Sequence, residues 1–159
     1  MKISLKSPCK AQGRLSYEIW KDGKVIERHQ MKNLVTLSGM NLIRDLLGQQ
    51  PGAAGISYFA LGTGALVPSL ATVKLTKEAF RDLVTRLWPD SGKLQVQYYL
   101  APNACNGLTL TEAACFGGAA SGTADSGSIY ACAPIEPAIV KNDSIAVTFS
   151  WECDWGGVS

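Results

Sequence analysis

The sequence predicts a mainly β protein: an antiparallel β-sandwich with one packed α-helix at about residues 38–47. Several short segments alternate apolar and polar side chains, Gly- and Asp-rich turns separate them, and a single segment has apolar residues at helical spacing. A chain of 159 residues fits one domain, and folding at this size buries roughly 68–70% of the surface of the unfolded chain. We expect an N-terminal extension over residues 1–13 and a single β-sandwich domain over residues 14–159.

The first element is a predicted β-hairpin. Apolar Leu15, Tyr17 and Ile19 alternate with other residues, and a second extended segment follows over residues 25–31. The dipeptide Asp22-Gly23 between them is typical of a tight hairpin turn. The two segments should therefore pair as neighbouring strands.

The predicted helix follows the hairpin. Apolar side chains recur at helical spacing up to Leu47, Ser38 is placed to cap the start, and Gly48 with Pro51 can end the helix.

Two later segments alternate cleanly, residues 94–100 and residues 145–153, and each should have one buried face. Between them, residues 117–127 are small and polar, with no apolar side chain large enough to anchor them. We expect a loop there that is mobile or ordered by a neighbouring subunit.

Composition favours an associating protein. Hydrophobic residues make up 47% of the chain and charged residues only 18%, which is more natural where neighbours cover part of the surface. The net charge of +2 comes from scattered Lys and Arg, so a nucleic-acid partner is not expected. The chain has neither a signal-peptide pattern nor a run of 18 apolar residues, and no membrane association is predicted.

The five cysteines are widely spaced and the chain has one histidine, which does not favour a metal site. They fit either buried reduced thiols or disulfides formed after release from the cytoplasm. Cys9, near the N-terminus, is the candidate for a disulfide between subunits.

No motif predicts an enzyme or a cofactor. The Gly62-x-Gly64 pattern resembles a phosphate loop, but no helix begins at its last glycine, so we interpret it as a loop at a sheet edge. Nucleophilic catalysis would require His29, which we expect to be an exposed strand residue.

Glu112 is the one acid in phase with apolar neighbours. A buried carboxylate must be paired or neutral, and we expect a structural ion pair between Glu112 and Arg81. A catalytic acid is the alternative.

The aromatic residues leave two interpretations open. A set that could form a sugar-stacking platform comprises Trp20, Trp88, Tyr98, Tyr99, Trp151 and Trp155. Such residues in alternating strands more often lie in the core or at a subunit interface. We expect contact surfaces at Trp20 and Trp155, and at the small residues Gly117, Gly118 and Gly127.

The order of motifs over roughly residues 14–155 resembles a family of bacteriophage tail, tail-fibre and baseplate virion proteins. The resemblance rests on Asp22-Gly23, Asn33-Leu-Val-Thr36, Tyr58-Phe-Ala-Leu-Gly-Thr-Gly64, Leu75-x-x-Glu78-x-x-Arg81, Glu112-x-x-x-Phe-Gly-Gly118, Ser128-Ile-Tyr-Ala131, Ile139-Val-Lys141 and a closing strand through Trp151. It implies that the segment after Glu78 is extended, although its apolar spacing also fits a helix.

The resemblance further implies a non-enzymatic virion component, assembled in the host cytoplasm, that forms a homo-oligomer, most simply a trimer, and docks to other virion proteins. The domain fills the chain, so a compact fibre adaptor, collar or capsid decoration protein is expected instead of a long fibre. The alternative is a carbohydrate-binding module that recognises glycans on the host surface.

Overall fold

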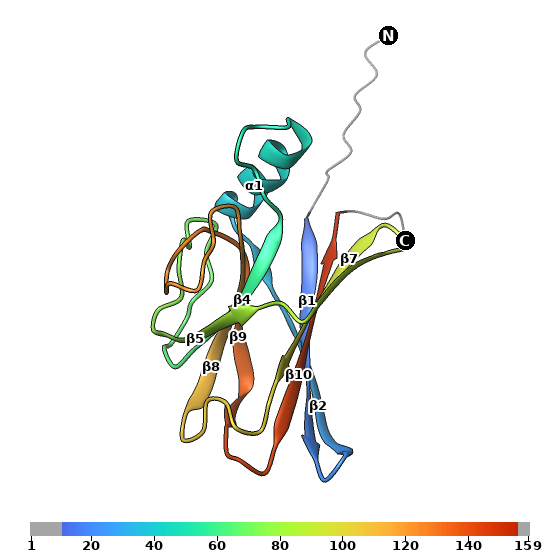
Figure 1. The fold of residues 1–159 in the computed structure, drawn as a ribbon, viewed down its shortest axis with the longest axis vertical. Coiled ribbons are helices and arrows are strands. Elements are labelled where there is room, and N and C mark those ends of the chain that lie inside the picture. The colour runs from blue at the N-terminus through green and yellow to red at the C-terminus, as the bar shows by residue number, and fades with distance from the viewer. Residues whose placement is uncertain (1–10, 156–159) are drawn as a thin grey trace.

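The protein is a β-sandwich with one helix, as the sequence predicts; a computed structural model describes residues 11–155 (Figure 1). The first sheet has the order β2 (Lys24–Lys32), β1 (Gln12–Lys21), β10 (Ala146–Asp154), β7 (Lys93–Leu100) and β6 (Arg86–Asp90). The second has the order β3 (Leu34–Val35), β9 (Ser128–Val140), β8 (Thr109–Gly117), β4 (Ile56–Gly62) and β5 (Glu78–Leu83). The helix α1 (Leu37–Leu47) lies against β9 at one end of the sandwich. All strand pairs are antiparallel.

The predicted hairpin is confirmed as β1 and β2. Asp22 and Gly23 have positive φ values of 50° and 73°, the left-handed conformations that a type I′ turn requires at both central positions. Strand β1 begins at Gln12, just before the expected domain start at residue 14.

The predicted helix is also confirmed, but its cap differs from the expected one. Thr36, not Ser38, is the N-cap: its hydroxyl oxygen accepts a hydrogen bond from the Gly39 amide at 3.0 Å. The same hydroxyl donates to the carbonyl oxygen of Ile129 at 2.7 Å. The helix starts directly after β3, which pairs with β9. Thr36, hydrogen-bonded to β9, therefore provides the cap. Gly48 ends the helix, as predicted.

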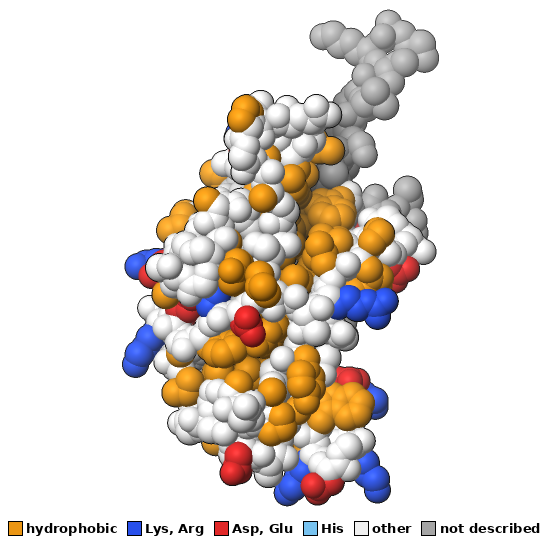
Figure 2. Space-filling view, in the orientation of Figure 1, with side chains coloured by type: hydrophobic (Ala, Val, Ile, Leu, Met, Phe, Trp, Pro, Cys, Tyr) orange, Lys and Arg blue, Asp and Glu red, His pale blue; other side chains and the backbone are white. Residues whose placement is uncertain are grey.

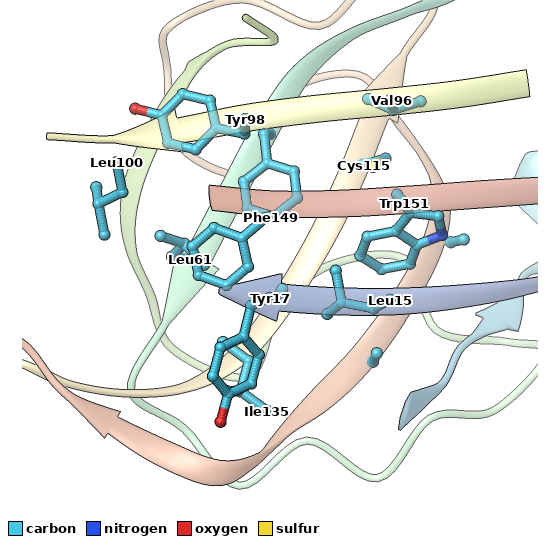
Figure 3. Packing of buried hydrophobic residues seen from close by; sticks show 14 of the residues in the cluster. Leu15, Tyr17, Leu61, Val96, Tyr98, Leu100, Cys115, Ile135, Phe149 and Trp151 are labelled. Atoms are coloured by element: carbon cyan, nitrogen blue, oxygen red, sulfur yellow. The ribbon is translucent and has the colours of Figure 1, made fainter. Parts of the chain in front are cut away.

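The core lies between the two sheets. The alternating final strand buries Val147, Phe149, Trp151 and Cys153 completely. Phe59 reaches them from the second sheet, with ring centroids 5.1 Å from Phe149. Figure 3 shows Tyr17 beside Phe149, and Leu15 beside Trp151, in this layer. The alternation therefore predicts the buried face of β10 correctly.

The segment after Glu78, whose apolar spacing also fits a helix, is extended, as expected. Strand β5 belongs to the second sheet and β6 to the first, so the chain crosses between the sheets at residues 84–85. Val84 donates its amide to Ser57 in the second sheet, and Thr85 donates to Gln97 in the first. The crossing places β6, the edge strand of the first sheet, beside α1.

Candidate functional site

Glu112 is fully buried, but the expected Arg81–Glu112 ion pair is wrong. The Glu112 carboxylate accepts hydrogen bonds from the backbone amides of Lys77 at 2.7 Å, Thr76 at 3.1 Å and Gly64 at 3.2 Å. Charge-assisted bonds of this kind stabilise a buried carboxylate without a cation. The Gly62-x-Gly64 segment is thus a loop held by Glu112 at the end of an interior strand, not at a sheet edge.

Arg81 pairs instead with Glu78, three residues earlier on β5. Two bonds of 2.7 Å and 2.8 Å join the guanidinium to the carboxylate, and both side chains are almost completely buried. The guanidinium also lies 4.0 Å from the ring centroid of Phe116, at cation–π distance. Planar guanidinium groups suit such combined contacts.

The same ion pair holds the loop over residues 118–127. Arg81 Nη1 donates to the carbonyl oxygen of Ser126 at 2.8 Å, and Glu78 accepts from the amide of Asp125 at 3.2 Å. The loop has no large apolar side chain, as the sequence shows, but Arg81 and Glu78 of the same chain hold it; its expected mobility or ordering by a neighbour stays a prediction. The anchor is polar and comes from another strand, so the composition of the loop does not reveal it.

An apolar groove lies beside α1, at the end of the sandwich where the two sheets part. It has a volume of about 470 Å³, within the size range of ligand and peptide pockets. Its walls are apolar or aromatic side chains from α1, from the strands and from the residue after β10: Leu42, Ile43, Leu46, Leu47, Ile56, Leu87, Leu94, Tyr130 and Trp155. Among residues 11–155, no charged residue lines it.

The helix is positioned over this groove by a close contact with β9. A Cβ atom at Gly39 would overlap the carbonyl group of Tyr130, so only glycine permits this approach. Gly39 and Leu42 are consequently the buried face of α1. Ile43, Leu46 and Leu47 then turn toward the groove.

Apolar side chains continue outside the groove along α1 and the segment that passes its first turn. The amide of Leu37 donates to the carbonyl oxygen of Leu70 at 2.9 Å, which joins the two. The large exposed side chains are Leu46 and Leu47 of the groove wall and, outside the groove, Leu37, Met40, Val67, Leu70 and Val73, with exposed fractions from 41% to 85%. Figure 2 shows hydrophobic side chains gathered beside α1 in the upper part of the molecule. We call the groove and these residues the apolar end.

The structure separates the predicted contact residues. Trp155 lies in the groove, whereas Trp20 pairs with Ala146 at the opposite end of β1 and β10. Gly117 is buried, and it has no room for a side chain, which would meet the Gly55 carbonyl oxygen and Leu42. Gly127 has a φ of 78° and stands against Ala120. These glycines serve internal packing, so their expected role in an interface stays a prediction.

The predicted aromatic platform does not form as one surface. Trp151 and Tyr98 are core residues, 0% and 4% exposed, whereas Tyr99 is 47% exposed on the outer face of the first sheet. Trp88 pairs with Gln95 on β7, and its ring lies 4.3 Å from the Arg86 guanidinium. Some of these aromatic residues therefore lie in the core and others on the surface.

The described cysteines are free thiols. Cys115, Cys132 and Cys153 are buried, and Cys105 is half-buried. Burial raises the pKa of Cys132 to about 11 and that of Cys153 to about 12, which keeps both protonated and unreactive at neutral pH. Cys9, the candidate for a disulfide between subunits, lies outside the described residues.

Other chemical groups are sparse within residues 11–155. His29 is half-buried on β2 and lies 3.0 Å from the Glu27 carboxylate. In this part of the chain no group of three or more His, Cys, Asp or Glu side chains could hold a metal ion. Over the same residues no helix is long and apolar enough to cross a membrane.

Comparisons with protein-family models, with curated proteins and with solved structures found no match.

Proposed function

We propose that this protein is a non-enzymatic structural component of a phage virion, and that it works by self-association through its apolar end. The observation that carries the proposal is the uncharged groove between α1 and the sheets, continued by exposed leucine and valine side chains. Contiguous apolar surface of this kind is typical of protein interfaces. The order of sequence motifs supports the phage assignment, and the low fraction of charged residues, 18%, supports association.

Such a contact would bury more than about 1,000 Å² of surface in a closed, symmetric homo-oligomer. The loop over residues 118–127 and, at the opposite end of the sandwich from α1, Trp20 would then be available to other virion proteins. The part played in the virion, as tail component, fibre adaptor, collar or decoration protein, follows from which proteins these surfaces bind. A trimer is the assembly that the family resemblance favours.

Sedimentation of the purified protein tests the contact surface. Leu47, 80% exposed at the end of α1, is replaced by Lys, a charge that suits a helix C-terminus and leaves the fold intact. We expect the wild-type protein to sediment as an oligomer at micromolar concentration and Leu47→Lys to dissociate at least tenfold more readily. Val140, 68% exposed near the opposite end of the sandwich, gives the matched control Val140→Lys, which should remain oligomeric.

Two results contradict the proposal. One is a monomer at high micromolar concentration together with absence of the chain from purified particles by mass spectrometry. The other is an oligomer that Leu47→Lys and Val140→Lys weaken equally, which would place the interface elsewhere.

A further inference from the structure

The outer face of the first sheet carries a continuous row of uncharged polar side chains. Gln97 of β7 stands opposite Ser150 of β10, Ser150 opposite Ser16 of β1, and Ser16 opposite Gln30 of β2. Because side chains alternate along a strand, these four point away from the core that Tyr17, on the same strand as Ser16, helps to form. The row crosses four strands at right angles to their direction.

The row forms the floor of a hollow with a volume of about 570 Å³. Thr148 and the pair Glu18–Arg28 border it on one side. A hollow of this volume is large enough for a small organic ligand of several rings. It lies on the outer face of the first sheet and shares no lining residue with the apolar groove.

The hollow presents hydrogen-bonding groups that the protein itself does not use. Within residues 11–155, the side chains of Gln30, Gln97 and Thr148 have no hydrogen-bond partner in the protein. Each glutamine amide offers two donors and a carbonyl acceptor, and the threonine hydroxyl can both donate and accept. A ligand rich in hydroxyl groups, which also donate and accept, would match this set.

The charged side chains near the hollow indicate which hydroxyl-rich ligands it suits. Among the described residues, Arg28 is the one lysine or arginine side chain that lines the hollow, and it is paired with Glu18 at 2.7 Å. Arg14 and Lys93 share the Glu152 carboxylate at 3.0 Å each and do not line the hollow. Arg86 of β6, which stands opposite Gln97 with its guanidinium over the Trp88 ring, does not line it either. The lining of the hollow is therefore complementary to an uncharged ligand.

We propose that this hollow, the polar face of the first sheet, binds an uncharged oligosaccharide. The ring hydroxyls would bond to the Gln97 and Gln30 amides, and the exposed ring of Tyr99, across from Thr148 on the adjacent strand, would offer an apolar surface to a sugar ring. The site differs from the aromatic platform that the sequence suggests, because amides and hydroxyls supply most of the contacts. The proposal is independent of self-association and of the virion assignment.

A glycan array provides the first test. Purified protein is applied to printed neutral oligosaccharides, sialylated oligosaccharides and bacterial O-antigen polysaccharides. We expect binding to at least one uncharged glycan. For that glycan, titration should show affinity about tenfold weaker in Gln97→Ala and in Gln30→Ala, since each loses a hydrogen-bonding group. Gln50→Ala, an exposed glutamine after α1, is the matched control and should bind like the wild type.

Nuclear magnetic resonance gives a second readout that separates binding from misfolding. The side-chain amide signals of Gln30 and Gln97 should shift when the oligosaccharide is added, and that of Gln50 should not. Gln97→Glu keeps the size of the side chain and the fold but adds a charge, and it should also bind more weakly. No binding to any uncharged glycan, binding to anionic glycans alone, or equal affinity in Gln97→Ala and Gln50→Ala would overturn the proposal.

Discussion

Two buried carboxylates lie on either side of Gly62 in the second sheet, and the protein stabilises them in different ways. Gly62 pairs with Glu112 of β8 on one side and with Glu78 of β5 on the other. Glu112 is held by three backbone amides without any cation. Glu78 is held by the guanidinium of Arg81. The second sheet thus offsets the cost of burying a carboxylate in two different ways.

Each carboxylate organises a different segment of the chain. Backbone donors belong to the chain itself, so Glu112 fixes the path of the segment over residues 63–77, which carries Leu70 to the start of α1. The Arg81–Glu78 pair reaches a second segment, the loop over residues 118–127. Both segments lie beside the apolar end. Buried charge in this protein therefore shapes the surface that we propose for self-association.

Removal of Glu112 should have the largest effect. Glu112→Ala leaves three part-buried amides without an acceptor, and we expect the free energy of unfolding to fall by about 3–5 kcal/mol. Glu112→Gln keeps one acceptor oxygen and should lose about half as much. Urea denaturation measures both values. A loss within about 0.5 kcal/mol, the range of surface substitutions, would contradict the buried role.

The double variant Glu112→Ala with Arg81→Ala tests whether the two carboxylates are held independently. The two side chains belong to separate hydrogen-bond networks, so their effects should add within about 0.5 kcal/mol. Glu78→Ala with Arg81→Ala should fall well short of additivity, because those two residues are partners. Strong coupling between Glu112 and Arg81 would show that the networks are not separate.

Arg81→Ala alone should lower the free energy of unfolding by about 3 kcal/mol. This is near the lower end for a broken buried pair, because Glu78 keeps the Asp125 amide as a partner. The loop over residues 118–127 should also lose its anchor. Proteinase K should then cut between these residues several times faster than in the wild type, as read by mass spectrometry. The matched control Arg44→Ala removes an arginine that is 68% exposed and should leave the cleavage rate unchanged. Equal rates in Arg81→Ala and the wild type would contradict the anchoring role.

Gly62→Ala tests the position between the two carboxylates and should have the smallest effect. A Cβ atom there would overlap the Glu112 side chain and stand 2.6 Å from the Lys77 carbonyl oxygen, so we expect a loss of about 1–3 kcal/mol from overpacking. At Gly55 a Cβ atom meets nothing within 4 Å. Gly55→Ala should therefore change the thermal unfolding temperature little, and equal shifts in the two variants would contradict the close packing at Gly62.

Local patterns in the sequence predict the elements of this fold well. Alternation identifies the buried side of β10, Asp22-Gly23 identifies the hairpin turn, and apolar spacing with Gly48 identifies the helix. Each of these signals depends on residues a few positions apart, and the backbone geometry of strands, turns and helices converts that spacing directly into a face. The cap at Thr36 was missed because its position depends on β9.

The partners of a side chain across the sheets depend on the packing of distant segments. Arg81 and Glu112 both lie in apolar stretches, which suggested a pair, but Arg81 stands opposite Ala60 and Glu112 opposite Gly62. The sequence shows the outward-facing polar residues of β1, β7 and β10, three of the four strands that carry the polar row. It does not show the order in which these strands lie side by side. The apolar groove combines side chains from α1, β4, β6, β7 and β9 with Trp155. Sequence spacing determines which side of a strand a residue occupies, and only the packing of distant segments determines what it meets there.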